Sequence, residues 1–119
     1  MNEPEMKRRT KEFALRVLKL VDRLPNSRSG NAIANQLVRS GTSVAANYRS
    51  LRRAKSRANF INKASIVEEE ADESCFWLEM IVDADLFPPK RVNPFLQEAN
   101  EITAILAATR KTTLKRSSK

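Results

Sequence analysis

The chain has 119 residues, 41% of them apolar and 30% charged, and its net charge is +8. This length favours a single domain over residues 1–119 and is too short for a second domain with its own core. No apolar run approaches the roughly 20 residues of a membrane-spanning helix, so neither a transmembrane segment nor a membrane partner is expected. The first ten residues are rich in charge and lack the apolar stretch of a secretory signal, so we expect a cytoplasmic protein. Because Cys75 is the only cysteine, we expect no internal disulfide.

The first two predicted helices follow from apolar residues that recur at helical spacing. The first runs from about residue 7 to residue 24 and ends at Pro25. The second begins near Ser27 or Ser29, because either serine can cap a helix N-terminus. The apolar stripe of this second helix consists of Ile33, Leu37, Val44, Tyr48 and Leu51.

Two further helices are predicted in the second half of the chain. Ser56 is a plausible N-cap for the third helix, which ends before Pro88. Its apolar residues repeat as a heptad seam, made of Phe60, Ala64, Val67, Ala71, Ser74, Leu78 and Ile81. Asn93 and Pro94 read as an N-cap followed by proline at the first helical position, which predicts the start of the fourth helix. Its inward face is predicted to contain Phe95, Ala99, Ile102 and Leu106, and short flexible ends are predicted at about residues 1–6 and 111–119.

Short connections make consecutive helices antiparallel neighbours, so the predicted fold is an all-α, up-down-up-down four-helix bundle. A three-helix bundle with a detached fourth helix is the alternative. It is disfavoured because the apolar face of the fourth helix would then be exposed to solvent.

Helices two and three carry motifs of a known family. The motifs comprise Gln36 to Val44, Ala46 to Tyr48, Ser56, Phe60, Ile61, Lys63, Ile66 to Ser74, and Phe76 to Leu78. The sequence resembles the four-helix bundle family first described as proteins encoded in intervening sequences of 23S ribosomal RNA. Leu24 and Pro25 fit as well, whereas Ala45 departs from the family pattern, which often has glycine there.

The resemblance implies a bundle that assembles into a homo-oligomeric ring and interacts with nucleic acid. It extends to the accessory variability protein of diversity-generating retroelements, which is a basic five-subunit barrel that binds nucleic acid and a reverse transcriptase. We therefore expect a homopentamer, with RNA or DNA and a reverse transcriptase as candidate partners. The resemblance supplies no catalytic residue and no cofactor.

Charge is distributed unevenly along the chain. No acidic residue occurs from Leu24 to Val67, and no Lys or Arg occurs from Glu68 to Asp85. The candidate nucleic-acid-binding residues are basic side chains at the end of the second helix and in the first helix: Arg49, Arg52, Arg53, Lys55, Arg57, Arg9 and Arg16. A basic patch of this kind binds phosphates with little base reading. The basic residues have three alternative explanations. They form a solvated surface, they pair with acidic residues of another subunit, or they belong to a scaffold that binds an acidic partner protein.

A polar stretch interrupts the second helix where a bundle prefers aliphatic residues. If the chain reverses near Ser56, Arg39 lies level with Glu73 and Asn47 lies level with about Ser65. We therefore predict a structural polar network of Arg39, Asn47, Glu69 and Glu73.

No residue pattern predicts an enzyme or a metal centre. The acidic run from Glu68 to Glu73 lacks the histidines that carboxylate-bridged metal sites in bundles use, because the chain has no histidine. Cys75 likewise has no histidine to activate it, and Asp72 and Glu79 lie one turn away on either side, where they raise a thiol pKa.

Overall fold

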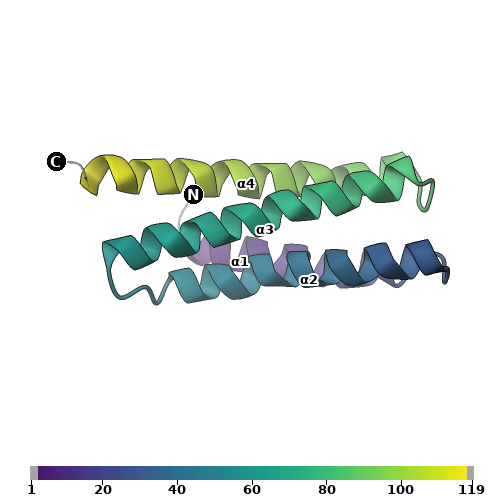
Figure 1. Ribbon diagram of the computed structural model, residues 1–119, viewed down its shortest axis with the longest axis horizontal. Helices are drawn as coiled ribbons and strands as arrows, with labels where there is room; N and C mark the ends of the chain where they lie inside the picture. The colour runs from purple at the N-terminus through teal and green to yellow at the C-terminus, as the bar shows by residue number, and fades with distance from the viewer. Residues whose placement is uncertain (1–2, 118–119) are drawn as a thin grey trace.

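The computed structural model describes residues 3–117 as four helices: α1 (Glu3–Val21), α2 (Arg28–Leu51), α3 (Arg57–Asp83) and α4 (Pro89–Ser117). They lie side by side as an antiparallel bundle 51 Å long (Figure 1). Each helix packs against the next, and α1 also approaches α4, whereas α1 and α3, like α2 and α4, are diagonal pairs. The predicted up-down-up-down bundle is therefore confirmed.

Two serine caps start the central helices. The Ser27 hydroxyl accepts a hydrogen bond from the backbone N–H of Gly30 at 3.1 Å, and the Ser56 hydroxyl accepts one from Asn59 at 3.0 Å. Each bond satisfies a donor that the first turn of a helix otherwise leaves without a partner. Of the two serines considered for α2, Ser27 is the cap, and the cap predicted for α3 is confirmed.

The start of α4 differs from the prediction. The helix begins at Pro89, and Pro94 lies inside it. Pro89 fits the first helical position because its fixed φ is helical and the missing N–H has no partner there. Pro94 removes only the hydrogen bond to the carbonyl of Lys90, a residue exposed to solvent near the helix start. The prediction that the fourth helix starts at Asn93 was therefore wrong.

Other helix ends also differ from the predicted ones. α1 begins at Glu3 and ends at Val21, while α4 continues to Ser117, so these helices include residues assigned to the ends of the chain. Residues 1–2 and 118–119 lie outside the described part. Along residues 3–117, no helix has a stretch both long and apolar enough to cross a membrane.

The core consists of the apolar stripes that the helical spacing indicated. α2 buries all five residues of its stripe, and α3 buries its seam from Ala64 to Ile81, with Phe60 half-buried. Val92 and Met6 are also buried, because α4 and α1 begin earlier than predicted. The close approach of α1 and α2 depends on Gly41, where a Cβ would lie 3.1 Å from a methyl of Val17. A larger residue at position 41 would therefore push α1 and α2 apart.

Candidate nucleic-acid interface

Polar side chains fix the register between α2 and α3. The Ser40 and Ser74 hydroxyls are buried and lie 3.0 Å apart, and Lys63 Nζ donates to Ser50 Oγ at 2.7 Å. Arg39 forms an ion pair with Glu73. These pairs are almost equidistant from Ser56, so the predicted reversal near this serine is confirmed.

The network around Arg39 differs in part from the prediction. Arg39 pairs with Glu70 at 3.1 Å as well as with Glu73, and Glu73 also accepts a hydrogen bond from the Trp77 indole at 3.0 Å. Glu70, Glu73 and Trp77 share the flank of α3 that lies beside α2, whereas Glu69 is exposed. Glu70 thus takes the place predicted for Glu69.

Asn47 does not join this network. Its amide donates to the Ser43 carbonyl one turn earlier in α2, at 2.9 Å. A bond of this kind satisfies the side chain within its own helix, so no partner from α3 is needed. Asn47 therefore does not fix the pairing of α2 with α3.

The exposure of Arg39 sets the expected cost of removing it. Its side chain is 47% exposed, so water screens its ion pairs with Glu70 and Glu73. A fully buried guanidinium would depend on such pairs far more strongly. We expect Arg39→Met to lower the free energy of unfolding by about 1 kcal/mol, rather than the about 3 kcal/mol of a buried pair. Urea unfolding followed by circular dichroism measures the difference. A loss of about 3 kcal/mol would contradict the exposed, screened pair seen here.

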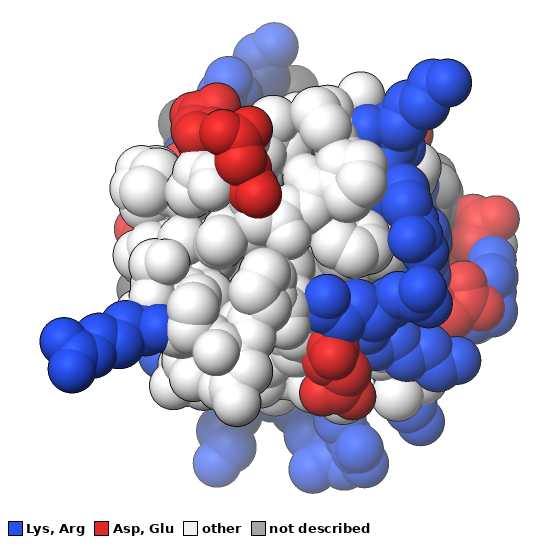
Figure 2. Space-filling view, turned by 90° about the vertical axis from the view of Figure 1, so that its right-hand side faces the viewer, with Lys and Arg blue, Asp and Glu red and all other residues white. Residues whose placement is uncertain are grey.

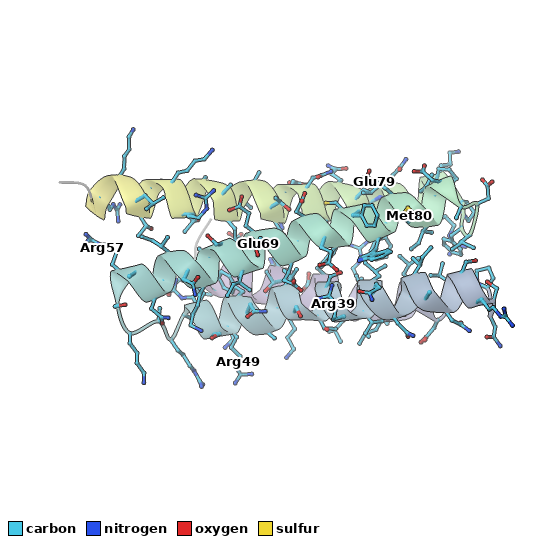
Figure 3. All side chains as sticks on the ribbon, viewed as in Figure 1. Arg39, Arg49, Arg57, Glu69, Glu79 and Met80 are labelled. Atoms are coloured by element: carbon cyan, nitrogen blue, oxygen red, sulfur yellow. The ribbon has the colours of Figure 1, made fainter. Side chains whose placement is uncertain are left out.

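Five of the candidate basic residues gather at one end of the bundle because α2 ends at Leu51 and α3 begins at Arg57. Arg49 extends away from α3, and Arg57 lies at the first turn of α3 (Figure 3). Arg52 forms an ion pair with Glu3 of α1. The five basic residues from Arg49 to Arg57 therefore share an end of the bundle rather than one face of a helix.

A groove between α1 and α2 adds two lysines to this end. It is lined by Lys7 and Lys11 of α1 and by Thr42, Ala45, Ala46 and Arg49 of α2. The small side chains of α2 contribute to its lining, and among residues 3–117 no acidic residue does. The groove therefore concentrates positive charge next to the α2–α3 turn. The sequence predicted a contribution from the first helix, but did not single out these two lysines.

Arg9 lies apart from that groove. Its guanidinium makes two hydrogen bonds to the Glu98 carboxylate, at 2.7 and 2.6 Å, and lies 3.2 Å from Glu101. These carboxylates, Glu98 foremost through its hydrogen bonds, raise the pKa of Arg9. The ion pair joins α1 to α4, so we leave Arg9 out of the proposed binding surface.

Arg16 also lies in a different groove. Its guanidinium carbon is 4.8 Å from the centroid of the Phe95 ring in α4. This stacking places it among the residues that line a hollow between α1 and the start of α4. Arg16 is therefore not part of the basic surface around Arg49.

Cys75 has a protonated thiol at neutral pH. Burial is the main reason that its pKa is raised to about 11, and the charges of Asp72 and Glu79 raise it further. Its sulfur lies 3.3 Å from Asn100 Oδ1. Within residues 3–117, no group of three or more Cys, Asp and Glu is placed to hold a metal ion. The carboxylate effect and a core or interface position for Cys75 were both expected from the sequence, and the burial of Cys75 confirms that position.

Comparison with known proteins places this bundle in a family. Residues 2–108 match the family model described as 23S rRNA-intervening sequence protein. A crystal structure from Bacteroides thetaiotaomicron, described as a protein with unknown function from the S23 ribosomal protein family, is similar at a TM-score of 0.86. That chain is 33% identical, and the match covers 93% of this chain and 99% of that one. A search of the curated proteins found no match. The chain belongs to the 23S rRNA-intervening sequence protein family.

Proposed function

We propose that this protein is a non-enzymatic, homo-oligomeric nucleic-acid-binding protein that recognises structured RNA or duplex DNA by charge and shape. The observation that carries the proposal is the groove lined by Lys7, Lys11 and Arg49, which has no acidic lining residue in the described part of the chain and adjoins the basic α2–α3 turn. A phosphate backbone is the natural ligand of such a surface, because binding releases the counterions that both partners hold.

The charges on this surface are accessible. Arg49, Arg53, Lys55 and Arg57 are exposed, and within residues 3–117 none of them takes part in an ion pair. Arg52 is the exception, since it pairs with Glu3. A phosphate that approaches Arg49 or Arg53 therefore does not have to displace a carboxylate. These contacts fix the position of a duplex without reading its bases.

Apolar residues outside the core support self-assembly. Leu15 and Leu18 are exposed on α1, and Phe76 is 50% exposed on α3, where its ring meets Trp77 edge to face. Since α1 and α3 are diagonal in the bundle, these apolar groups lie on different sides of the protein. If the α1 patch of one copy contacts the α3 patch of the next, the two contacting surfaces differ. Contacts of this head-to-tail kind form a closed ring when the rotation between neighbouring copies divides a full turn evenly. We propose a ring of five, the size that the family resemblance implies.

Light scattering coupled to gel filtration tests the assembly. We expect a mass of several times 13.5 kDa for the wild type, and a smaller mass for Phe76→Ser, because an apolar contact between copies is lost. The matched control is Ser65→Ala, a change on α3 outside this patch. A wild-type monomer that persists at high micromolar concentration would rule out the ring.

Fluorescence anisotropy with labelled RNA hairpins and DNA duplexes tests the binding. If roughly 5 phosphates are neutralised, the logarithm of affinity falls against the logarithm of salt concentration with a slope near −4.5 on duplex DNA. Sequences of equal length and shape should bind alike. Affinity no tighter than that of an unrelated basic protein would favour the alternative of a scaffold for an acidic partner such as a reverse transcriptase.

A further inference from the structure

A second basic hollow lies toward the end of the bundle opposite the α2–α3 turn. It has a volume of about 180 Å³ and is bounded by the second half of α1, the α1–α2 and α3–α4 connections and the first turns of α4. Its lining combines four basic side chains with two aromatic rings: Arg16, Lys19, Arg23, Arg91, Phe87 and Phe95. The sequence assigned Phe95 to the core, but both rings are only half-buried.

Stacking on the rings holds two of the guanidinium groups. The Arg16 guanidinium carbon is 4.8 Å from the centroid of Phe95, and that of Arg91 is 4.8 Å from the centroid of Phe87. A stacked guanidinium has one plane covered, while the N–H groups at its edge remain available for hydrogen bonds. Because the two arginines are already held in place, less side-chain freedom is lost when an anion binds.

The lining of this hollow is basic. Lys and Arg side chains form a band along one side of this end of the bundle, with acidic side chains at its edges (Figure 2). Within residues 3–117, no acidic residue lines the hollow and no ion pair engages Arg16, Lys19, Arg23 or Arg91. The rim therefore attracts anions, whereas the floor is apolar because it consists of the two rings and the buried Leu20.

We propose that this hollow binds a nucleotide unit, with its base against the two stacked guanidinium–ring pairs and its phosphate on the other cations of the rim. A bare phosphate would leave the apolar floor exposed, and an uncharged ring would leave the cations without an anion. The volume is below the roughly 300 Å³ of drug-sized pockets, which fits a single flat ring system. Arginine also matches the oxygens of a phosphate with two parallel hydrogen bonds.

The site is separate from the proposed duplex-binding surface, so it does not depend on that function. Its nucleotide has two sources with the same chemistry: a free mononucleotide, or an unpaired nucleotide in a single strand. Binding of a strand would use the same combination of base stacking and phosphate contact.

Isothermal titration with adenosine 5′-monophosphate tests the proposal, with ribose 5-phosphate and adenosine as ligands that each lack one half of the recognised unit. We expect the nucleotide to bind at least about tenfold tighter than either one, since base stacking contributes roughly that factor. Phe95→Leu keeps an apolar side chain at the floor but removes the ring on which Arg16 stacks, and should weaken nucleotide binding about tenfold. Ribose 5-phosphate has no base, so its binding should weaken less.

Arg23→Gln and Lys90→Gln are the matched charge variants. Both residues are exposed, but only Arg23 lines the hollow, so only its replacement should weaken both phosphate ligands. Arg23→Gln also keeps the test valid if Phe95→Leu does not fold. The Arg49→Glu/Arg53→Glu double variant should bind the nucleotide like the wild type, so a failure of duplex binding is distinguished from a failure here.

An unlabelled single strand of adenosines distinguishes the two sources. Displacement of the mononucleotide by this strand identifies the unpaired nucleotide as ligand, and nucleotide binding without displacement identifies the free nucleotide. The proposal is overturned if the nucleotide binds no tighter than ribose 5-phosphate. It is also overturned if a short peptide of glutamate and phenylalanine binds the hollow and the nucleotide does not.

Discussion

Reversing the charges of Arg49 and Arg53 with Arg49→Glu/Arg53→Glu is expected to weaken duplex binding about 30-fold at 0.15 M salt, because two phosphate contacts are lost. The slope against salt should fall from near −4.5 to about −2.7 for the same reason. Both side chains are exposed, and neither is in an ion pair within residues 3–117. The fold should therefore tolerate the change. Arg52 is left intact, because its reversal would place a second carboxylate beside Glu3.

The matched control is Arg28→Glu/Lys90→Glu, which changes the net charge equally at the opposite end of the bundle. Both control residues are exposed and lie outside the groove lined by Lys7, Lys11 and Arg49. Anisotropy titrations over a range of salt concentrations, with light scattering to check oligomer size, compare the two variants. Equal weakening by both would show that only total charge matters, and the assignment of the binding surface would be wrong.

Replacing Arg9 with Arg9→Met is expected to lower the free energy of unfolding by about 2 kcal/mol, which corresponds to a melting temperature lower by about 6 °C. The Arg9 side chain is only 16% exposed and binds Glu98, itself 19% exposed, through two hydrogen bonds. Its removal leaves a largely desolvated carboxylate without this cation. The expected loss is below that of a fully buried pair, since water still reaches both groups.

The adjacent Arg8 provides the control for this measurement. It pairs with Glu12 one turn along α1, and both side chains are more than half exposed. Arg8→Met should therefore cost no more than about 0.5 kcal/mol. The double variant Arg9→Met/Glu98→Leu should recover stability, because the carboxylate that still loses its cation, Glu101, is 51% exposed and hydrated. Thermal unfolding by circular dichroism measures all three, and equal shifts for Arg8→Met and Arg9→Met would disprove the role of the α1–α4 ion pair.

The fold could be predicted from local features of the chain. Helical spacing of apolar residues, the serine at position 56 and the prolines after residue 87 depend only on neighbours within a few residues. These features therefore specify where each helix lies and which face it buries. The start of α4 was misplaced because two positions, Pro89 and Pro94, both suit the first turn of a helix, and only packing of Val92 into the core selects the earlier one.

The basic residues around the α2–α3 turn could also be found in the sequence, because they are neighbours along the chain and no acid lies between them. Which of them stay available for a ligand depended on residues distant in sequence. Glu98 lies 89 residues from Arg9, and Glu3 pairs with Arg52 across α1 and α2. The rings of Phe87 and Phe95 joined Arg16 of α1 in one hollow only when α4 packed beside α1. Charge pairing and pocket shape depend on through-space distances, which only the assembled bundle defines.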